Sequence, residues 1–559
     1  MNYLEKFLKT LLIASLLMPL IAQESEDEDE GLEVVVTTAT KTEKDILDTA
    51  QAVTALSGNQ LLELGLNNIK DLNNMIPGLY VQNTDTNAPI ITLRGIRTEN
   101  VTELGDPAVG IHVDGVYVAR PQAANALMFD LERTELTRGP QGTLYGRNSV
   151  VGTLNIVTAK PNFDIQGGSL NLTGGQLNEA GLRAHYNLPI NEKLALRFAY
   201  MEQSKDSFLD GFWDGSQLDW RRLPSNVRDQ FQVITSPDQR SYLSDYAWYL
   251  GCSTQPGNGC GQGNFSDPYN KIKADPSEFY TAIKDSAWRI SATYVIDDNS
   301  DLNLQYENYE DNGKGWTNVL SCELMKTRKG FTAKDRPANT CTDILGSEDR
   351  YQSYANTPGF NQMNIDSFRA IYKRQLNATT NLTVNYGYQE LEQSSQFEID
   401  GGVNYQYGMA FNINRLLTES NVLDAYITGA NSEWAWVGGV FTSTEDNDML
   451  ANFTAELNGH DFFWQPNREL NHYAVYGQAT YALRDDLFFT LGGRFSYDEK
   501  SDVGGRNINC NTGNGCYPQI YDTGGNPFDT INQLAPDYWI QMGRMVAVSY
   551  THLTLPTRS

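Results

Sequence analysis

Beyond its first residues the sequence has no long apolar run, and its mean hydropathy is −0.45. A transmembrane helix needs about 20 consecutive, mostly apolar residues, so we expect none in the body of the chain. This absence excludes a helical membrane bundle but not a membrane barrel. Barrel strands alternate apolar and polar residues, which keeps the mean hydropathy low.

Basic residues are also scarce. The 559 residues include 42 lysines and arginines against 69 aspartates and glutamates, which gives a formal net charge of −27. Nucleic-acid binding requires a basic face, so we expect no nucleic-acid partner. The acidic balance is compatible with a secreted or surface protein.

Histidine is rarer still, with five in the chain and none at metal-ligand spacing. The sequence lacks GxSxG, a P-loop, and a GxGxxG motif before a helix. Carboxylate pairs are common, but on so acidic a chain they are typical of a solvated surface. We therefore expect no enzyme, no cofactor and no metal site.

The N-terminus and the few cysteines indicate export. Lys6 and Lys9 precede the apolar run 11–21, and Ala22 follows it, which predicts a signal peptide over residues 1–22. An exported chain meets an oxidising compartment, where disulfides form. The simplest pairing joins neighbours in the sequence, because the six cysteines occur as three close pairs. The expected disulfides join Cys252 to Cys260, Cys322 to Cys341, and Cys510 to Cys516.

What the chain does contain is glycine, tyrosine and tryptophan, with 47, 30 and 9 residues. This composition indicates a β-rich chain with many turns, and a large soluble β protein would explain it equally well. After Gly167 apolar and polar residues alternate, which predicts half-buried strands, about eleven of them between residues 168 and 499. Short turns separate long connections regularly, as in bacterial outer-membrane barrels, and all three cysteine pairs fall in the long connections.

The N-terminal part is organised differently. The acidic run 24–30 predicts a disordered linker. A β-prone run at 32–37 follows, suited to pairing with another protein's sheet edge or to forming the first strand of the next domain. Ser57 is a plausible helix cap, with helical spacing up to Pro77 and Gly78. Asp114-Gly115 predicts a hairpin turn, and Gly139, Gly142, Gly146 and Gly152 are needed for backbone geometry.

Four motifs stand in one order along this part: IPGLYVQN, LRGI, VDGVYV and RGPQGTLYGRN. In that order and spacing they resemble the plug domain of TonB-dependent outer-membrane receptors. The β-prone run resembles these receptors' TonB box, the segment that pairs with the periplasmic protein TonB. Its residues are Leu32, Glu33, Val34, Val35, Val36 and Thr37.

The resemblance implies a mainly β fold in which an N-terminal α/β plug closes a transmembrane antiparallel barrel. It implies a monomer in the outer membrane, in contact with outer-membrane lipid. Its nutrient is expected to be a ferric siderophore or another metal chelate. Cobalamin, haem and oligosaccharides are alternatives within the family, and a soluble secreted β-scaffold adhesin is the alternative of another class.

The resemblance also implies residue roles. Arg94 and Arg138 would pair with barrel glutamates and hold the plug, although ordinary surface arginines are the alternative. Ligand contacts are expected after the IPGLYV strand and after the hairpin, at Gln82, Asn83, Tyr117, Arg120 and Gln122.

The expected domains are a linker with the TonB box (23–43), the plug (44–161) and a barrel half (162–545). A barrel of this kind has about 22 strands, and an open half would leave unpaired edges in lipid. We therefore expect a truncated sequence. Its tail, residues 546–559, is expected to lack an alternating strand and to lie outside the native coding sequence.

Overall fold

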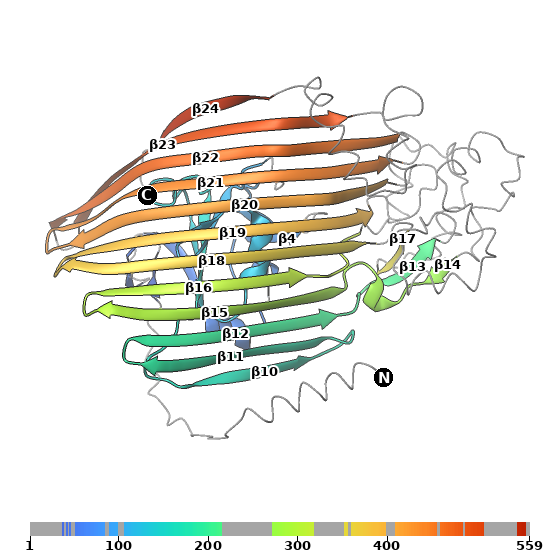
Figure 1. The fold of residues 1–559 in the computed structure, drawn as a ribbon, viewed down its shortest axis with the longest axis horizontal. Helices are drawn as coiled ribbons and strands as arrows, with labels where there is room; N and C mark the ends of the chain where they lie inside the picture. The colour runs from blue at the N-terminus through green and yellow to red at the C-terminus, as the bar shows by residue number, and fades with distance from the viewer. Residues whose placement is uncertain are drawn as a thin grey trace, which may run out of the picture.

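A large antiparallel sheet dominates the computed structural model (Figure 1). The structure describes residues 36–38, 41–42, 44–45, 51–66, 68–83, 89–98, 105–214, 271–317, 351–355, 359–398, 409–455, 459–484, 487–507 and 545–554. Twelve described strands form this sheet, each paired with the strand before it. They are β10 (Gly167–Gly174), β11 (Ala180–Asn191), β12 (Leu194–Lys205), β15 (Ile283–Asp297), β16 (Ser300–Asp311), β18 (Phe360–Asn377), β19 (Thr380–Glu398), β20 (Met409–Ala430), β21 (Trp434–Ala455), β22 (Gly459–Arg484), β23 (Leu487–Asn507) and β24 (Met545–Thr554).

Strands β10 to β23 of this sheet number eleven, as the alternating pattern predicts. The twelfth corrects the expectation that the tail has no such strand. Val546, Val548 and Tyr550 alternate with smaller or polar residues, and this short pattern suffices to pair β24 with β23. The expectation about the coding sequence stays a prediction.

The two faces of the sheet differ in polarity, and the exposed face is the apolar one. On the face turned away from the N-terminal domain, apolar side chains are exposed, among them Val475, Leu491 and Phe495. Their neighbours in sequence, such as Ala474 and Arg494, are buried on the other face. An apolar outer face and a polar inner face are what a strand needs when lipid lies on one side and a filled lumen on the other. Among the described residues, no helix is long and apolar enough to cross a membrane.

Tight turns join the strands at one end of the sheet, and long connections join them at the other (Figure 1). The turn after β11 is closed by the Asn191 carboxamide, whose Oδ1 accepts from Lys193 N at 2.8 Å. Asn377 and Asn431 do the same for the turns after β18 and β20. Asparagine side chains mimic a backbone turn in this way, so the residue type explains the short end of the sheet.

A small three-stranded sheet lies at the end with the long connections (Figure 1). Its order is β14-β13-β17, with a parallel pair between β13 and β17. Its elements, with one short helix, are β13 (Asp210–Asp214), β14 (Lys271–Lys273), η5 (Pro276–Glu278) and β17 (Gln352–Ala355).

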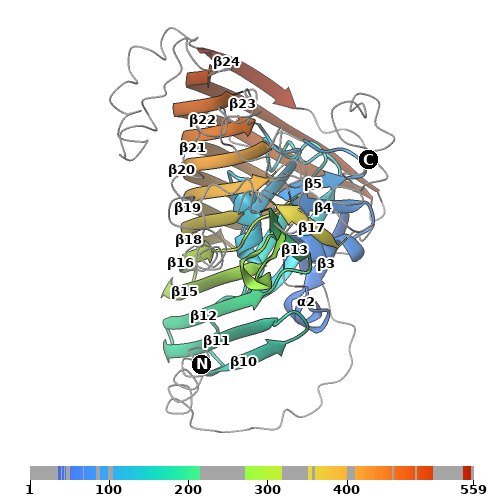
Figure 2. The same cartoon turned by 90° about the vertical axis from the view of Figure 1, so that its right-hand side faces the viewer.

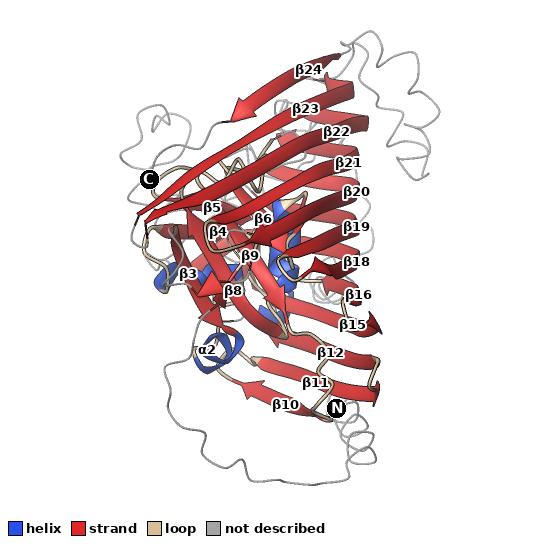
Figure 3. Ribbon diagram, turned by 90° about the vertical axis from the view of Figure 1, so that its left-hand side faces the viewer, coloured by secondary structure: helices blue, strands red, loops and turns tan. Residues whose placement is uncertain are grey.

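The N-terminal domain lies against the inner face of the large sheet (Figure 2). Its own sheet has the order β3-β8-β9-β6-β7, and the hairpin β4-β5 forms a second, separate sheet. The described part of the domain also includes three short helices, drawn in blue in Figure 3. The elements are β3 (Ala52–Ser57), α2 (Gly58–Glu63), η2 (Ile69–Asn74), β4 (Leu79–Asn83), β5 (Pro89–Leu93), β6 (Val109–Val113), β7 (Val116–Val118), η3 (Pro121–Leu127), β8 (Leu131–Arg138) and β9 (Gly152–Thr158).

Ser57 caps α2 as predicted, in a capping box with Gln60. The long helix expected up to Pro77 is nevertheless wrong. Gly65 adopts a φ of 66°, which ends the α-helix, and η2 follows as a separate 3-10 helix. The Asp114-Gly115 turn is confirmed, with φ values of 51° and 81° between β6 and β7.

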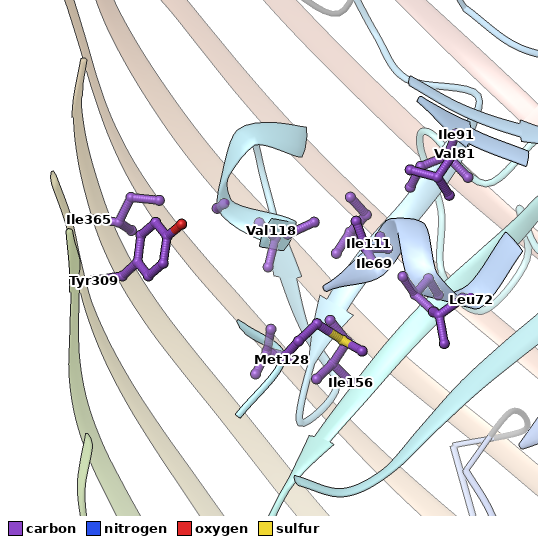
Figure 4. Close-up of a cluster of buried hydrophobic side chains, with 14 of the residues drawn as sticks. Ile69, Leu72, Val81, Ile91, Ile111, Val118, Met128, Ile156, Tyr309 and Ile365 are labelled. Atoms are coloured by element: carbon purple, nitrogen blue, oxygen red, sulfur yellow. The ribbon is translucent and has the colours of Figure 1, made fainter. Parts of the chain in front are cut away.

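The core of the domain is apolar and continues onto the large sheet. Ile69, Leu72 and Ile156 are fully buried, and the same cluster includes Tyr309 and Ile365 from β16 and β18. Figure 4 shows these two sheet residues on the side that faces Val118 and Met128 of the domain. The domain is therefore held on the sheet by continuous apolar packing, because separating the two would expose this apolar surface to water.

Candidate functional site

The predicted TonB box enters the described structure only at its end. Val36 and Thr37 form β1, which pairs with β2 (Lys44–Asp45). Residues 32–35 lie outside the described residues, as do the signal peptide and the acidic linker. The role of this segment in binding TonB stays a prediction.

The predicted disulfides also fall outside the part of the chain that the structure describes. The six cysteines belong to the connections between β13 and β14, between β16 and β17, and between β23 and β24. They are Cys252, Cys260, Cys322, Cys341, Cys510 and Cys516. The structure therefore shows none of the three bonds, and the pairing by sequence neighbours stays a prediction.

One buried carboxylate captures the end of the predicted TonB box. Glu135 lies on β8 and is almost fully buried. Its Oε2 accepts from Thr37 Oγ1 at 3.1 Å and from Thr38 N at 3.0 Å. Arg133 Nε donates to Oε1 at 2.7 Å, so the charge is compensated. Hydrogen bonds to an ionised group are stronger than neutral ones, which makes Glu135 a firm anchor for the segment.

The domain adds two further contacts to Thr38. Asn155 Nδ2 donates to Thr38 Oγ1 at 3.1 Å, and Tyr145 OH donates to Thr38 O at 3.0 Å. Burial, together with the nearby Glu135 carboxylate, raises the pKa of the Tyr145 phenol well above its usual range. Tyr145 therefore stays protonated and remains a donor.

The next turn of the chain is fixed to the large sheet instead. Lys41 forms a buried ion pair with Asp424 of β20. Its ammonium lies 5.4 Å from the Tyr145 ring centroid, 4.9 Å from that of Tyr426 and 5.3 Å from that of Tyr476. A cation enclosed by aromatic faces and one carboxylate is well compensated. The segment after the predicted TonB box thus bridges the domain and the sheet.

Ion pairs hold the rest of the domain to the sheet. Arg197 of β12 binds Asp130 with two nitrogens, at 2.8 and 2.5 Å. Arg289 of β15 donates to the backbone oxygens of Phe129 and Asp130, both at 3.2 Å, and is itself paired with Glu307. Here the sheet supplies the arginines and the domain supplies the acceptors.

A second group of charges joins the domain to β23. Asp106 binds Arg147 at 2.5 Å and Lys500 of β23 at 2.7 Å. Burial alone would raise the pKa of Asp106, but the two cations outweigh it and lower the pKa to about 2. The carboxylate is therefore ionised throughout the physiological range.

Neither predicted anchoring arginine forms an ion pair with a described residue. Arg94 is exposed on the turn after β5, with a φ of 52°, and Arg138 is half-buried at the end of β8. Their proposed anchoring role stays a prediction. A domain arginine that does reach a sheet glutamate is Arg120, which pairs with Glu445 of β21.

The residues predicted to contact ligand are mostly covered. Tyr117 is buried and accepts from Asn148 Nδ2 at 2.6 Å, and Arg120 and Gln122 are also buried. Gln82 is half-buried, and the side chain of Asn83 lies outside the description. A ligand could meet the buried three only after the domain moves, so their role stays a prediction.

Sequence reasoning passed over His112, which lies at the centre of the domain. Its ring meets Tyr117 and Tyr145 edge-on, with centroids 5.6 and 4.8 Å away. Burial, then the charges of Lys41 and Arg494, lowers the pKa of His112 to about 3. The imidazole is therefore neutral. The sequence around a single histidine on a β-strand does not predict such burial or such aromatic contacts.

Sequence reasoning also missed Lys41, Glu135 and Asp424. Glu135 stands inside the stretch that ends in RGPQGTLYGRN, so its neighbourhood could have singled it out. Lys41 and Asp424 carried no signal, because they lie 383 residues apart.

An open cavity of about 810 Å³ lies beside this bridge, at the end of the sheet with the tight turns. Thr38, Lys41 and Thr42 form one of its walls. The hairpin turn at Asp114 and Gly115 and the turn 297–301 form others. Lysines and arginines are as numerous in its lining as aspartates and glutamates.

A domain seated in the polar face of an apolar-backed antiparallel sheet defines a plugged membrane protein. Residues 45–153 match the family described as TonB-dependent Receptor Plug Domain. The motif resemblance is thus confirmed: the N-terminal domain is a TonB-dependent receptor plug, and the sheet has the fold of these receptors.

Relatives and solved structures agree on this. The pesticin receptor of Yersinia pestis is 31% identical over 187 residues, which cover 33% of this chain and 27% of that protein. The ferrioxamine B receptor of Salmonella typhimurium (strain SL1344) is 29% identical over 202 residues, covering 34% and 27%. The crystal structure of the ferric yersiniabactin uptake receptor FyuA from Yersinia pestis has a TM-score of 0.60 at 15% identity, covering 91% of this chain and 61% of that one. The matches therefore span less than two thirds of these proteins.

Proposed function

We propose that this chain belongs to a TonB-dependent transporter of the outer membrane that imports a ferric siderophore. The observation that carries the proposal is the bridge made by Thr37, Thr38 and Lys41. These contacts fix the end of the predicted TonB box to the plug and the residues after it to the large sheet. The names of the relatives support the cargo, because they include receptors for ferrioxamine B and ferripyoverdine.

The mechanism follows from competing contacts. TonB would add a strand to residues 32–37 and would have to displace the pairing of β1 with β2 and the capture by Glu135. Each hydrogen bond to a charged group contributes about 1.5–3 kcal/mol. These contacts therefore oppose TonB binding until the equilibrium between the bound and the released segment is shifted. A ligand that loosens these contacts must, by reciprocity, bind more tightly when TonB is engaged. No covalent step is involved.

The proposed location in the outer membrane rests on the exposed apolar face of the sheet. A soluble adhesin with the same strands would bury that face. Fractionation of cells that produce the whole gene product separates the two. Recovery in the outer-membrane pellet is expected, and recovery in the soluble supernatant would support the adhesin.

Uptake in a strain lacking its own receptors tests transport. The probes are ferrioxamine B, ferripyoverdine and ferric yersiniabactin, each carrying radioactive iron. Cobalamin with its own label is the fourth probe, because a vitamin B12 transporter of Vibrio vulnificus is 28% identical over 166 residues. We expect accumulation of an iron probe that requires TonB. Deletion of residues 34–36 should abolish uptake and leave surface binding intact. Uptake that survives the deletion would contradict the assignment of the TonB box.

A further inference from the structure

One group of charges between the plug and the large sheet remains open to water. Asp106 of the plug pairs with Arg147, also of the plug, and with Lys500 of β23. The side chain of Asp106 is 39% exposed. In the other described ion pairs between plug and sheet, the carboxylates are at most 8% exposed; they belong to Asp130, Asp424 and Glu445. A solute can therefore reach Asp106 without opening the packed interface.

The position of Lys500 places this group toward the long connections. Lys500 lies 13 residues from Leu487, where β23 begins after a tight turn. A tilted barrel strand crosses the hydrocarbon in about 9–11 residues, so Lys500 lies beyond the membrane span. In the proposed function, this is the side from which the chelate arrives.

The two cations divide the carboxylate of Asp106 between them. Arg147 Nη2 donates to Oδ1 at 2.5 Å, and Lys500 Nζ donates to Oδ2 at 2.7 Å. Each oxygen thus has a cation of its own, which is the arrangement that binds an anionic oxygen group strongly. The same two donors fit any anion with two neighbouring oxygens, and nothing in the arrangement requires that the anion belong to the protein.

Another carboxylate near the two cations is already engaged. Asp498 of β23 lies close enough to influence both Arg147 and Lys500. Its Oδ1 is hydrogen-bonded to His472 Nδ1, which holds it in place on the sheet. If the Asp106 carboxylate leaves, Arg147 and Lys500 outnumber Asp498, and the site attracts another anion.

The backbone around Asp106 is held independently of its carboxylate. Gly105 O accepts from Arg120 Nη1 at 3.3 Å, and β6 begins three residues after Asp106. Pro107 favours an extended backbone at the residue before it. The carboxylate can therefore leave the two cations by a change of side-chain rotamer, without movement of the plug sheet.

We propose that Asp106 is an internal substitute for the ligand. Its carboxylate occupies Arg147 and Lys500 until an anionic oxygen group of the incoming chelate, a free carboxylate or the charged oxygens of a chelating group, displaces it. This inference rests on the proposed function and deepens it, because such a site selects anionic chelates over cationic ones. Asp106, Arg147 and Lys500 are then specificity-determining residues.

The first test compares removal of the competitor with removal of a donor. Binding of ferrioxamine B, ferripyoverdine and ferric yersiniabactin is measured on the whole gene product. For the chelate that the unsubstituted protein binds, Asp106→Asn should strengthen binding roughly fivefold, the size of a partly exposed ion pair. Lys500→Gln should weaken it.

The matched controls are Glu179→Gln and Lys205→Gln. These two residues form an ion pair of 3.0 Å with side chains 31% and 36% exposed, and both belong to the large sheet. Neither change should affect binding. Opposite effects of Asp106→Asn and Lys500→Gln support the exchange, because damage to the fold would weaken binding in both. Weaker or unchanged binding in Asp106→Asn would overturn it, as would equal effects in the control pair.

A second test needs no knowledge of the cargo. In Asp106→Cys, the new thiol is treated with methanethiosulfonates that carry either a sulfonate or a quaternary ammonium group. The extent of reaction is read by mass spectrometry of the peptide with residue 106, because the chain has six cysteines of its own. The sulfonate reagent should react several-fold faster, and adding Lys500→Gln should reduce this preference.

Equal rates for the two reagents would overturn the anion site even if a chelate binds elsewhere on the protein. Failure of the proposed function is a different result. In that case the unsubstituted protein would bind none of the three iron chelates, whatever preference the reagents show at residue 106.

Discussion

At the scale of single residues, the plug depends on carboxylates that are shielded from water. Glu135 and Asp424 each compensate a charge and hold one end of the same short segment. An uncompensated charge at either place would cost about 3–5 kcal/mol, so neither carboxylate is tolerated there without its cationic partner. This makes the segment after the predicted TonB box sensitive to conservative substitutions.

Glu135→Gln should loosen the predicted TonB box without disturbing the fold. The amide keeps the size of the side chain but exchanges charged hydrogen bonds to Thr37 and Thr38 for neutral ones. The difference is about 1 kcal/mol, or roughly fivefold in equilibrium. Titration with the C-terminal domain of TonB should show tighter binding by that factor. Glu132→Gln is the matched control, because Glu132 is exposed and its ion pair is with Arg133 alone among described residues. Equal affinities in both variants would remove Glu135 from the release step.

His112 should make the plug acid-sensitive. Its folded-state pKa of about 3 lies below the ordinary value of 6.5, so the unfolded chain binds a proton first. Stability from the neutral imidazole is therefore complete above about pH 6.5 and is lost as the pH falls toward 3. In His112→Phe, the thermal midpoint should fall less between pH 7 and pH 5 than in the unsubstituted protein. Parallel curves for the two proteins would show that His112 does not titrate in this way.

At the scale of elements, the plug approaches the sheet where glycines allow it. Gly146 has a φ of 78°, and a Cβ there would lie 2.6 Å from the Arg494 guanidinium of β23. Gly387 of β19 likewise faces Val116 of β7. The RGPQGTLYGRN motif thus requires Gly146 for two reasons, its turn geometry and its close contact with the large sheet.

Gly146→Ala should destabilise the plug by about 1–2 kcal/mol, the cost of a left-handed conformation in an L-residue, with the clash against Arg494 in addition. Gly493→Ala is the control, because a Cβ at Gly493 meets nothing within 4 Å and its φ is not left-handed. Urea unfolding of both variants in detergent measures the difference. A loss of equal size in both would point to a general effect of the sheet region instead.

Elements were also what the sequence predicted best. Alternation predicted about eleven strands, and the regular change between short turns and long connections predicted the two different ends of the sheet. The helix up to Pro77 was wrong because Gly65 interrupts it, which local spacing does not reveal. The ion pairs between the plug and the large sheet could not be predicted from the sequence, for a different reason. Lys41 meets Asp424, and Asp106 meets Lys500, across hundreds of residues, and only closure of the fold brings such partners together.

At the scale of the whole molecule, two surfaces make opposite demands. The inner face of the sheet buries polar groups against the plug, and the outer face exposes apolar ones. A soluble protein would reverse this arrangement. The fold is therefore stable only if something apolar covers the outer face, and the proposed transport requires that cover to be lipid.

Leu491→Arg tests that requirement directly. Leu491 is 62% exposed and lies four residues from the tight turn that starts β23, near the middle of a span of about 10 residues. In lipid, an arginine at this depth should cost about 2–4 kcal/mol. In water, the same change should cost nothing and improve solubility. Folding into phospholipid vesicles, followed by the shift in gel migration without heating, should show a clear loss for Leu491→Arg and little change for Leu491→Phe. Efficient folding of Leu491→Arg, with better recovery in the soluble fraction, would favour the secreted β scaffold over the membrane transporter.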